Sequence, residues 1–165
     1  MQVASVSEKS QEMLLRLEQL VGEIGVLHSK LILLIGLPRA GKTALLGEFG
    51  KRVDAELLNV GSALGRRLAA IPQKNRHLQA GGILRELADQ HARRDLLLVD
   101  NIELLFDSTL QLNPLDLLKR YAHTRRVVAV WPGELHERRL TYADMGHPEQ
   151  QDYGMDGLVP FEIQQ

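Results

Sequence analysis

Short, fully apolar runs alternate along this chain with stretches in which apolar residues recur every three or four positions. The run LILLI at residues 31–35 is apolar throughout, and LLLV at residues 96–99 repeats the pattern. Runs of this length are typical of strands that are buried on both faces of a parallel sheet. Further strands are predicted at residues 56–60, 127–131 and 158–163. Pro160 favours an edge position for the last strand, because proline cannot donate a ladder hydrogen bond.

Helical spacing fills the segments between these strands. Residues 8–24 carry apolar side chains on one face, which predicts a leading amphipathic helix that packs against the sheet. Further helices are predicted from Thr43 to near Gly50, from about Ser62 to before Pro72, around residues 83–87, and from Asn113-Pro114 to about His123. Strands that alternate with helices predict an α/β three-layer sandwich with a mostly parallel sheet of about five strands. Residues 134–157 show no clear period, and we expect an irregular, mobile loop there.

Length and composition narrow the picture. A chain of 165 residues with 44% hydrophobic residues fits one domain over residues 1–165, with a core from about residue 30. A net charge of −1 gives no overall basic surplus for nucleic acid, and the lack of cysteine excludes disulfides and thiolate metal sites. The N-terminal segment is charged throughout and the longest apolar run, residues 31–37, is too short for a bilayer, so we expect a cytoplasmic protein without membrane contact.

The strongest chemical signal follows the first strand. The sequence GLPRAGKT matches the phosphate-loop (Walker A) pattern G-x-x-x-x-G-K-[ST] at every fixed position. Its residues, Gly36, Leu37, Pro38, Arg39, Ala40, Gly41, Lys42 and Thr43, are therefore predicted to bind the phosphates of a nucleotide. The glycines let backbone N–H groups converge on phosphate oxygens, and the helix that follows adds its N-terminal dipole. Lys42 is expected to reach the β- and γ-phosphates, and the Thr43 hydroxyl is expected to ligate Mg²⁺.

A phosphate-loop site also needs a carboxylate at the end of a neighbouring strand to support the metal. Asp100 directly follows the apolar run at residues 96–99 and is the predicted Walker B residue. The next residue is Asn101, which can orient a water molecule but cannot accept its proton. Glu103 is then either a general base or a solvated residue at a helix start.

Other side chains give weaker signals. Four arginine pairs are candidate arginine fingers: Arg66-Arg67, Arg93-Arg94, Arg125-Arg126 and Arg138-Arg139. We expect most to be surface charges, with Arg138-Arg139 the best functional candidate. The six histidines show no metal-binding spacing. Trp131 either stacks on a base or packs in the core. The guanine signature N-K-x-D does not occur, so ATP is the expected nucleotide.

The phosphate loop, LLLVDNIELLF at residues 96–106 and RVVAVWPG at residues 126–133 together resemble the BrxF family of small P-loop proteins. That family belongs to type 3 BREX bacteriophage-exclusion systems. The wider core resembles the ATPase half of AAA+ proteins, and because the chain ends at Gln165 we expect no C-terminal helical lid. The resemblance implies antiviral defence beside a larger ATPase and a methyltransferase, with DNA contacted through these partners.

Three functions follow from these observations. The leading one is an ATP-binding accessory subunit that acts as a nucleotide-dependent switch on partner proteins and either hydrolyses ATP or leaves that to a completed complex. One alternative is a small-molecule or nucleotide kinase, with Arg138-Arg139 on a mobile lid. The other is a module that holds ATP without hydrolysis, which Asn101 favours. The sequence does not choose between a monomer and an oligomer.

Overall fold

The computed structural model describes residues 2–25, 30–36, 41–142, 151–154 and 157–163, and helices and strands alternate within them. The helices are α1 (Gln2–Ile24), α2 (Lys42–Val53), α3 (Val60–Ala69), α4 (Arg76–His91) and α5 (Pro114–Tyr121), with 3-10 helices η1 (Gln73–Asn75), η2 (Glu103–Phe106) and η3 (Ser108–Leu110). The strands are β1 (Leu31–Ile35), β2 (Leu57–Asn59), β3 (Leu96–Asp100), β4 (Arg126–Val130), β5 (Gly133–His136), β6 (Arg139–Tyr142), β7 (Gln151–Gly154) and β8 (Val159–Glu162). No described helix is both long enough and apolar enough to cross a membrane.

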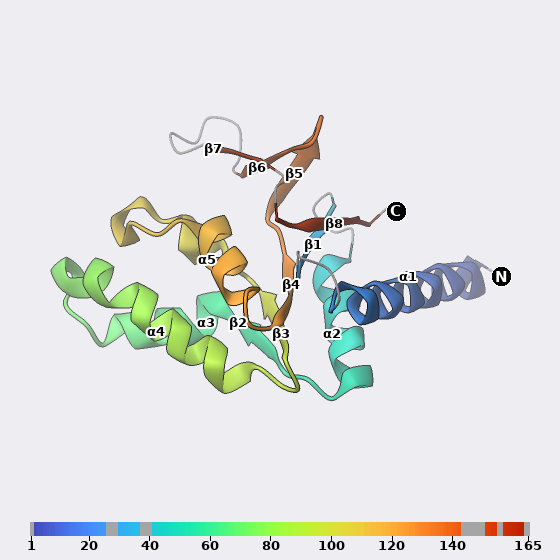
Figure 1. Ribbon diagram of the computed structural model, residues 1–165, viewed down its shortest axis with the longest axis horizontal. Helices are drawn as coiled ribbons and strands as arrows, with labels where there is room; N and C mark the ends of the chain where they lie inside the picture. Colours follow the sequence, from blue (N-terminus) through green and yellow to red (C-terminus); the bar gives the residue numbers. More distant parts are fainter. Residues whose placement is uncertain (1, 26–29, 37–40, 143–150, 155–156, 164–165) are drawn as a thin grey trace.

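Five strands form the central sheet in the order β2-β3-β4-β1-β8, and each strand pairs with its neighbours in parallel (Figure 1). The predicted parallel sheet of about five strands is therefore confirmed. β8 lies at one edge and pairs with β1, with Pro160 opposite Leu33. The edge position that Pro160 favoured is also confirmed. Connections between parallel strands must cross over a face of the sheet, which is where the helices lie.

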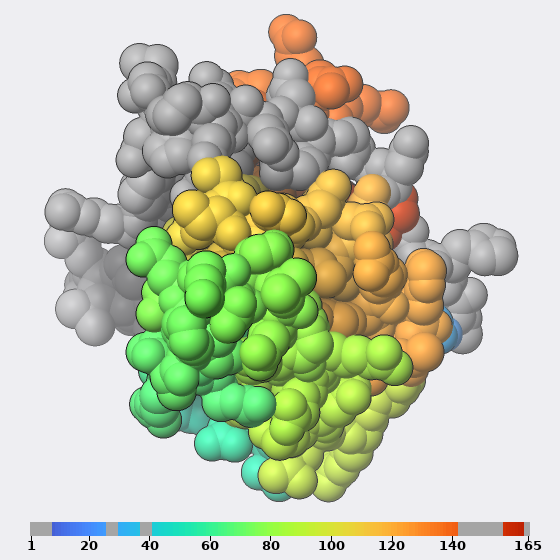
Figure 2. All heavy atoms as spheres, turned by 90° about the vertical axis from the view of Figure 1, so that its left-hand side faces the viewer, coloured from blue at the N-terminus to red at the C-terminus, as the bar shows by residue number. Residues whose placement is uncertain are grey.

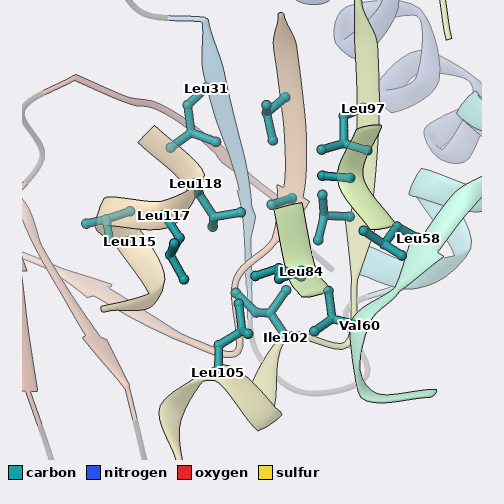
Figure 3. Close-up of a cluster of buried hydrophobic side chains, with 14 of the residues drawn as sticks. Leu31, Leu58, Val60, Leu84, Leu97, Ile102, Leu105, Leu115, Leu117 and Leu118 are labelled. Carbon is teal, nitrogen blue, oxygen red and sulfur yellow. The ribbon is translucent and has the colours of Figure 1, made fainter. Parts of the chain in front are cut away.

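Helices cover both faces of this sheet, as Figure 1 shows, with α1 and α2 on one side and α3, α4 and α5 on the other. Alternate residues of β1 supply the two cores: Leu31 and Leu33 pack toward α4 and α5, whereas Ile32 and Leu34 pack toward α1 and α2. Figure 3 shows the first of these cores, where leucines from the strands meet leucines of α4 and α5. This division explains why the run at residues 31–35 is apolar at every position.

The boundary between β2 and α3 differs from the prediction because Asn59 caps the helix. Asn59 ends β2 after three residues, and its side chain accepts a hydrogen bond from the Ser62 N–H at 3.0 Å, so α3 begins at Val60. Asn113 caps α5 in the same way, as its sequence position indicated. The leading helix is confirmed over residues 8–24 and extends back to Gln2.

The expectation of an irregular loop at residues 134–157 is wrong for its described part. There β5, β6 and β7 form a second, antiparallel sheet, and β5 and β6 make a hairpin (Figure 1). Glu137 and Arg138 form its two-residue turn with φ values of 49° and 66°. This geometry fits a type I′ turn, which normally carries Asn-Gly. The hairpin was missed because its turn residues give no such signal.

Candidate functional site

The phosphate loop connects the end of β1 to the start of α2, at the carboxyl edge of the central sheet. Gly36 directly follows β1, and Gly41 precedes α2 with a φ of 92°. This left-handed conformation is open to glycine and strained for other residues, which accounts for the second glycine of the motif. The intervening loop residues, Leu37, Pro38, Arg39 and Ala40, lie outside the described residues. Gly41 has no side chain to cap α2, so no cap side chain occupies the free N–H groups in the first turn of this helix.

Lys42 is the first residue of α2, and its ammonium group lies against two backbone carbonyls. It donates to the carbonyl oxygen of Gly36 at 2.9 Å and to that of Trp131 at 3.1 Å. Desolvation by burial lowers the pKa of Lys42, while the negative charges of Glu103 and Asp100 partly offset this effect. The amine therefore sits between the phosphate loop and the end of β4, in a position from which it can contact phosphate oxygens.

Thr43 and Asp100 come together although they lie 57 positions apart. The Thr43 hydroxyl donates to Oδ1 of Asp100 at 3.1 Å, and the Asn101 N–H donates to the same oxygen at 2.8 Å. Asp100 is only 9% exposed and is the one charged residue that is buried within the described part of the chain. Its strand is not the direct neighbour that the sequence suggested, because β4 lies between β3 and β1. The pairing nevertheless occurs, because α2 carries Thr43 toward the end of β3.

Asn101 is held by structural contacts. Its side-chain amide donates to Oδ1 of Asn59 at 2.9 Å, and its backbone carbonyl accepts a hydrogen bond from the Gly61 N–H at 3.0 Å. The φ of Asn101 is 54°, a left-handed value that asparagine tolerates better than glutamate does. This backbone conformation gives a physical reason for Asn, rather than Glu, after Asp100. The side-chain amide of Asn101 thus connects the end of β3 to the start of α3. Because this amide is already engaged with Asn59, the role of Asn101 in orienting water stays a prediction.

Glu103 begins η2 and is exposed, as the helix-start interpretation expected. Its carboxylate also acts on Lys42, since it raises the pKa of that amine against the effect of burial. The structure therefore brings Glu103 near the phosphate loop without a hydrogen bond that would fix it as a base.

Trp131 packs in the core, which was one of the two alternatives for it. Its side chain is 0% exposed and meets Phe106 edge-on, with ring centroids 5.4 Å apart. The indole N–H donates to the carbonyl oxygen of Thr141 in β6 at 3.0 Å. Trp131 thus links Lys42, through its own carbonyl, to the β5–β6 hairpin. A buried ring in these contacts is not available to stack on a base.

The arginine-finger candidates are spread over the molecule. Arg138 lies in the exposed turn of the β5–β6 hairpin, and Arg139 is an exposed residue at the start of β6. Arg125 is paired with Asp89 at 2.8 Å, and Arg67 is paired with Glu86 at 3.1 Å. None of the described contacts joins an arginine of these pairs to Lys42, Thr43 or Asp100. The finger role thus stays a prediction.

The oxygen atoms available at this site suit a Mg²⁺ ion that is also bound by a triphosphate. They suit a metal ion bound by protein side chains alone less well. No cluster of three or more His, Cys, Asp or Glu side chains that could hold a metal occurs in the described ranges. Mg²⁺ usually binds one or two protein oxygens and completes its shell with water and phosphate. The hydroxyl of Thr43 and the carboxylate of Asp100, 3.1 Å apart, form such a pair of oxygens. The residues present therefore fit the cofactor pair ATP and Mg²⁺.

Sequence reasoning missed two contributors to the site. Asn59 contacts Asn101, and the signal that could have found it is an asparagine directly before a helical stretch. The backbone carbonyl of Trp131 holds Lys42, and no residue-type pattern predicts a backbone contact of this kind. Both contributions depend on the strand order, which places the ends of β2, β3, β4 and β1 along one edge.

The strand order and the position of the loop between β1 and α2 define an α/β three-layer sandwich of the P-loop type, with a parallel five-stranded central sheet. Among solved structures, the chain is similar to a DNA replication initiation factor, with 21% identity and a TM-score of 0.43 over 90% of this chain and 46% of that one. It is also similar to PCH-2 of C. elegans, with 14% identity and a TM-score of 0.36 over 96% and 41%. The chain spans less than half the length of either structure. No protein-family model and no curated protein matches it.

Proposed function

We propose that this chain binds ATP with Mg²⁺ on residues 36–43 and acts as a nucleotide-dependent switch subunit. The observation that carries the proposal is the contact between Thr43 and Asp100, with Lys42 beside them at the end of β4. Lys42 would exchange its carbonyl partners for β- and γ-phosphate oxygens, and Thr43 and Asp100 would support the metal. Bound Mg²⁺ would neutralise charge on the phosphates.

A module that holds ATP without hydrolysis is the second candidate, because Asn101 cannot accept a proton and is engaged with Asn59. Glu103 is the remaining carboxylate near Lys42 that could serve as a base. If Glu103 cannot reach an attacking water, hydrolysis requires a partner protein to supply the group that accepts the proton of that water.

The biological setting is proposed from the sequence resemblance to the BrxF family. In that setting the chain would serve bacteriophage exclusion and respond to a larger ATPase or a methyltransferase of the same system, with the nucleotide state deciding which surface is ordered. The support for this role is the likeness at the phosphate loop and at residues 96–106 and 126–133.

Steady-state ATP hydrolysis by the purified chain with Mg²⁺ tests the proposal, with Lys42→Ala to exclude a contaminating ATPase. Turnover that is lost in the variant supports a self-sufficient switch. Turnover that appears only when a partner is added supports a site completed in trans, and slow turnover that no partner changes supports the holding module.

The defence role has its own test in cells that carry the complete exclusion system. Replacing the chain with Lys42→Ala should raise phage plating to the level of cells without the system. Unchanged exclusion in cells that lack this chain altogether would overturn the role.

A further inference from the structure

One end of the molecule is basic although the chain as a whole is not. Residues 57–85 contain five Lys and Arg residues and no Asp or Glu. The whole chain has 20 Lys and Arg residues and 21 Asp and Glu residues. The remaining residues thus carry 15 basic against 21 acidic side chains, a net charge of −6. A charge asymmetry of this kind matters for binding more than the net charge does.

Four of the five cations lie where α3 ends and α4 begins. Arg66 and Arg67 occupy the last turn of α3, Lys74 lies in η1, and Arg76 is the first residue of α4. We call these four residues the basic tip. The two helices pack against each other, so the short connection gathers the cations at one end of the molecule. Figure 2 looks onto that end, where the segment, in green, faces the viewer.

Little within the described structure neutralises the basic tip. Arg67 pairs with Glu86 at 3.1 Å, and both side chains are about half exposed. Arg66 and Lys74 are exposed and have no ion pair among the described residues. The guanidinium of Arg76 donates through Nε to the backbone carbonyl of Ile71 at 3.0 Å, and this contact positions the Arg76 side chain. The positive charge of Arg66 and Lys74 is therefore presented to solvent at the connection between α3 and α4.

The side chains around these cations narrow the class of partner. Residues 57–85 contain no Phe, Tyr or Trp, and His77 is the single aromatic ring among them, so they lack the row of aromatic side chains on which successive unpaired bases stack. Arginine and lysine at a helix junction are well suited to phosphate oxygens along a duplex backbone, which they contact without reading sequence. Leu78, which is 73% exposed in the first turn of α4, adds an apolar contact beside them.

We infer that the basic tip binds the phosphate backbone of double-stranded nucleic acid without sequence preference. The surface is formed by α3, η1 and α4 and does not include the phosphate loop. Nucleic-acid binding is thus independent of the proposed nucleotide site, and Lys42→Ala keeps it.

Fluorescence anisotropy with a labelled DNA duplex, without nucleotide and at about 50 mM salt, tests this inference. Arg66→Glu combined with Lys74→Glu should weaken binding at least tenfold. The matched control is Lys9→Glu combined with Lys51→Glu, which makes the same charge change on the exposed surfaces of α1 and α2. This control should bind within about twofold of the wild type if only long-range charge is altered. Thermal melting of each variant verifies that the fold is intact.

The salt dependence gives a second measurement. Replacing Arg66 and Lys74 by glutamine should make the slope of log affinity against log salt shallower by about 1.8, because each lost contact to duplex DNA removes about 0.9. Single-stranded DNA should bind more weakly than the duplex. Absence of duplex binding by the wild type, equal losses in the tip and control variants, or tighter binding of the single strand would each overturn the inference.

Discussion

Asp100 is the residue on which the candidate site most depends. Its carboxylate is buried, and its Oδ1 accepts from both the hydroxyl of Thr43 and the N–H of Asn101. Burying a carboxylate is costly unless its oxygens are hydrogen-bonded or bind a cation. These contacts satisfy part of that need, and a magnesium ion would satisfy more of it.

We expect Asp100→Asn to weaken the binding of ATP with Mg²⁺ by about tenfold or more, since it removes the charge but keeps the side-chain shape. Binding of ATP in EDTA should change little, because in the proposed site the phosphates would contact the loop rather than Asp100. Titration of both nucleotide forms into wild type and variant measures the difference. Equal losses in the two conditions would argue against a metal role for Asp100.

At the residue scale, the sequence predicted which residues gather at the candidate site, but it did not predict their other hydrogen-bond partners. The spacing of GLPRAGKT and the strand before Asp100 were enough to place Lys42, Thr43 and Asp100 together, because both motifs end strands of one parallel sheet. The asparagine before α3 could have identified Asn59 as a helix cap, but its pairing with Asn101 depends on the register of β2 beside β3, which the sequence does not give.

At the scale of elements, the β5–β6 hairpin is the main departure from the sequence prediction. Its strands are short, and the turn places two charged residues at positive φ. At the base of the hairpin, Gly133 lies so close to β6 that a Cβ there would fall 1.6 Å from the carbonyl oxygen of Thr141. The hairpin therefore depends on a glycine that no motif identifies.

Gly133→Ala should destabilise the fold by about 1–3 kcal/mol, because the added methyl group would collide with the Thr141 carbonyl and force β5 away from β6. The control is Gly82→Ala in α4, where a Cβ meets nothing within 4 Å. That change should stabilise the helix by about 0.5–1 kcal/mol. Urea denaturation measures both variants, and a stable Gly133→Ala protein would show that the hairpin does not pack as described.

The fluorescence of Trp131 can report whether a change at the phosphate loop reaches this hairpin, because Trp131 is the single tryptophan of the chain. If phosphate draws Lys42 away from the Trp131 carbonyl, the surroundings of the indole change. Titration with ATP and Mg²⁺ should therefore change the tryptophan emission in a saturable way, and Lys42→Ala should abolish the response. Unchanged emission under conditions where ATP is bound by another assay would exclude this link.

At the scale of the whole molecule, two surfaces with different proposed roles lie at different places on the central sheet. Its carboxyl edge carries the candidate nucleotide site, whereas α3 and α4 extend the basic tip from one face. The strand and helix pattern predicted this three-layer arrangement because buried parallel strands and amphipathic helices have distinct apolar periods. The pattern could not predict the strand order, which depends on how the crossovers pack in three dimensions.

The most direct test of the central claim is equilibrium binding of a fluorescent ATP analogue to the purified chain, with Mg²⁺ and with EDTA, for wild type and Lys42→Ala. We predict saturable one-to-one binding by the wild type that Mg²⁺ strengthens, unlabelled ATP displaces and Lys42→Ala abolishes. Binding that is unaffected by Lys42→Ala, or no binding by a folded wild-type chain, would contradict the assignment of the nucleotide site to the phosphate loop.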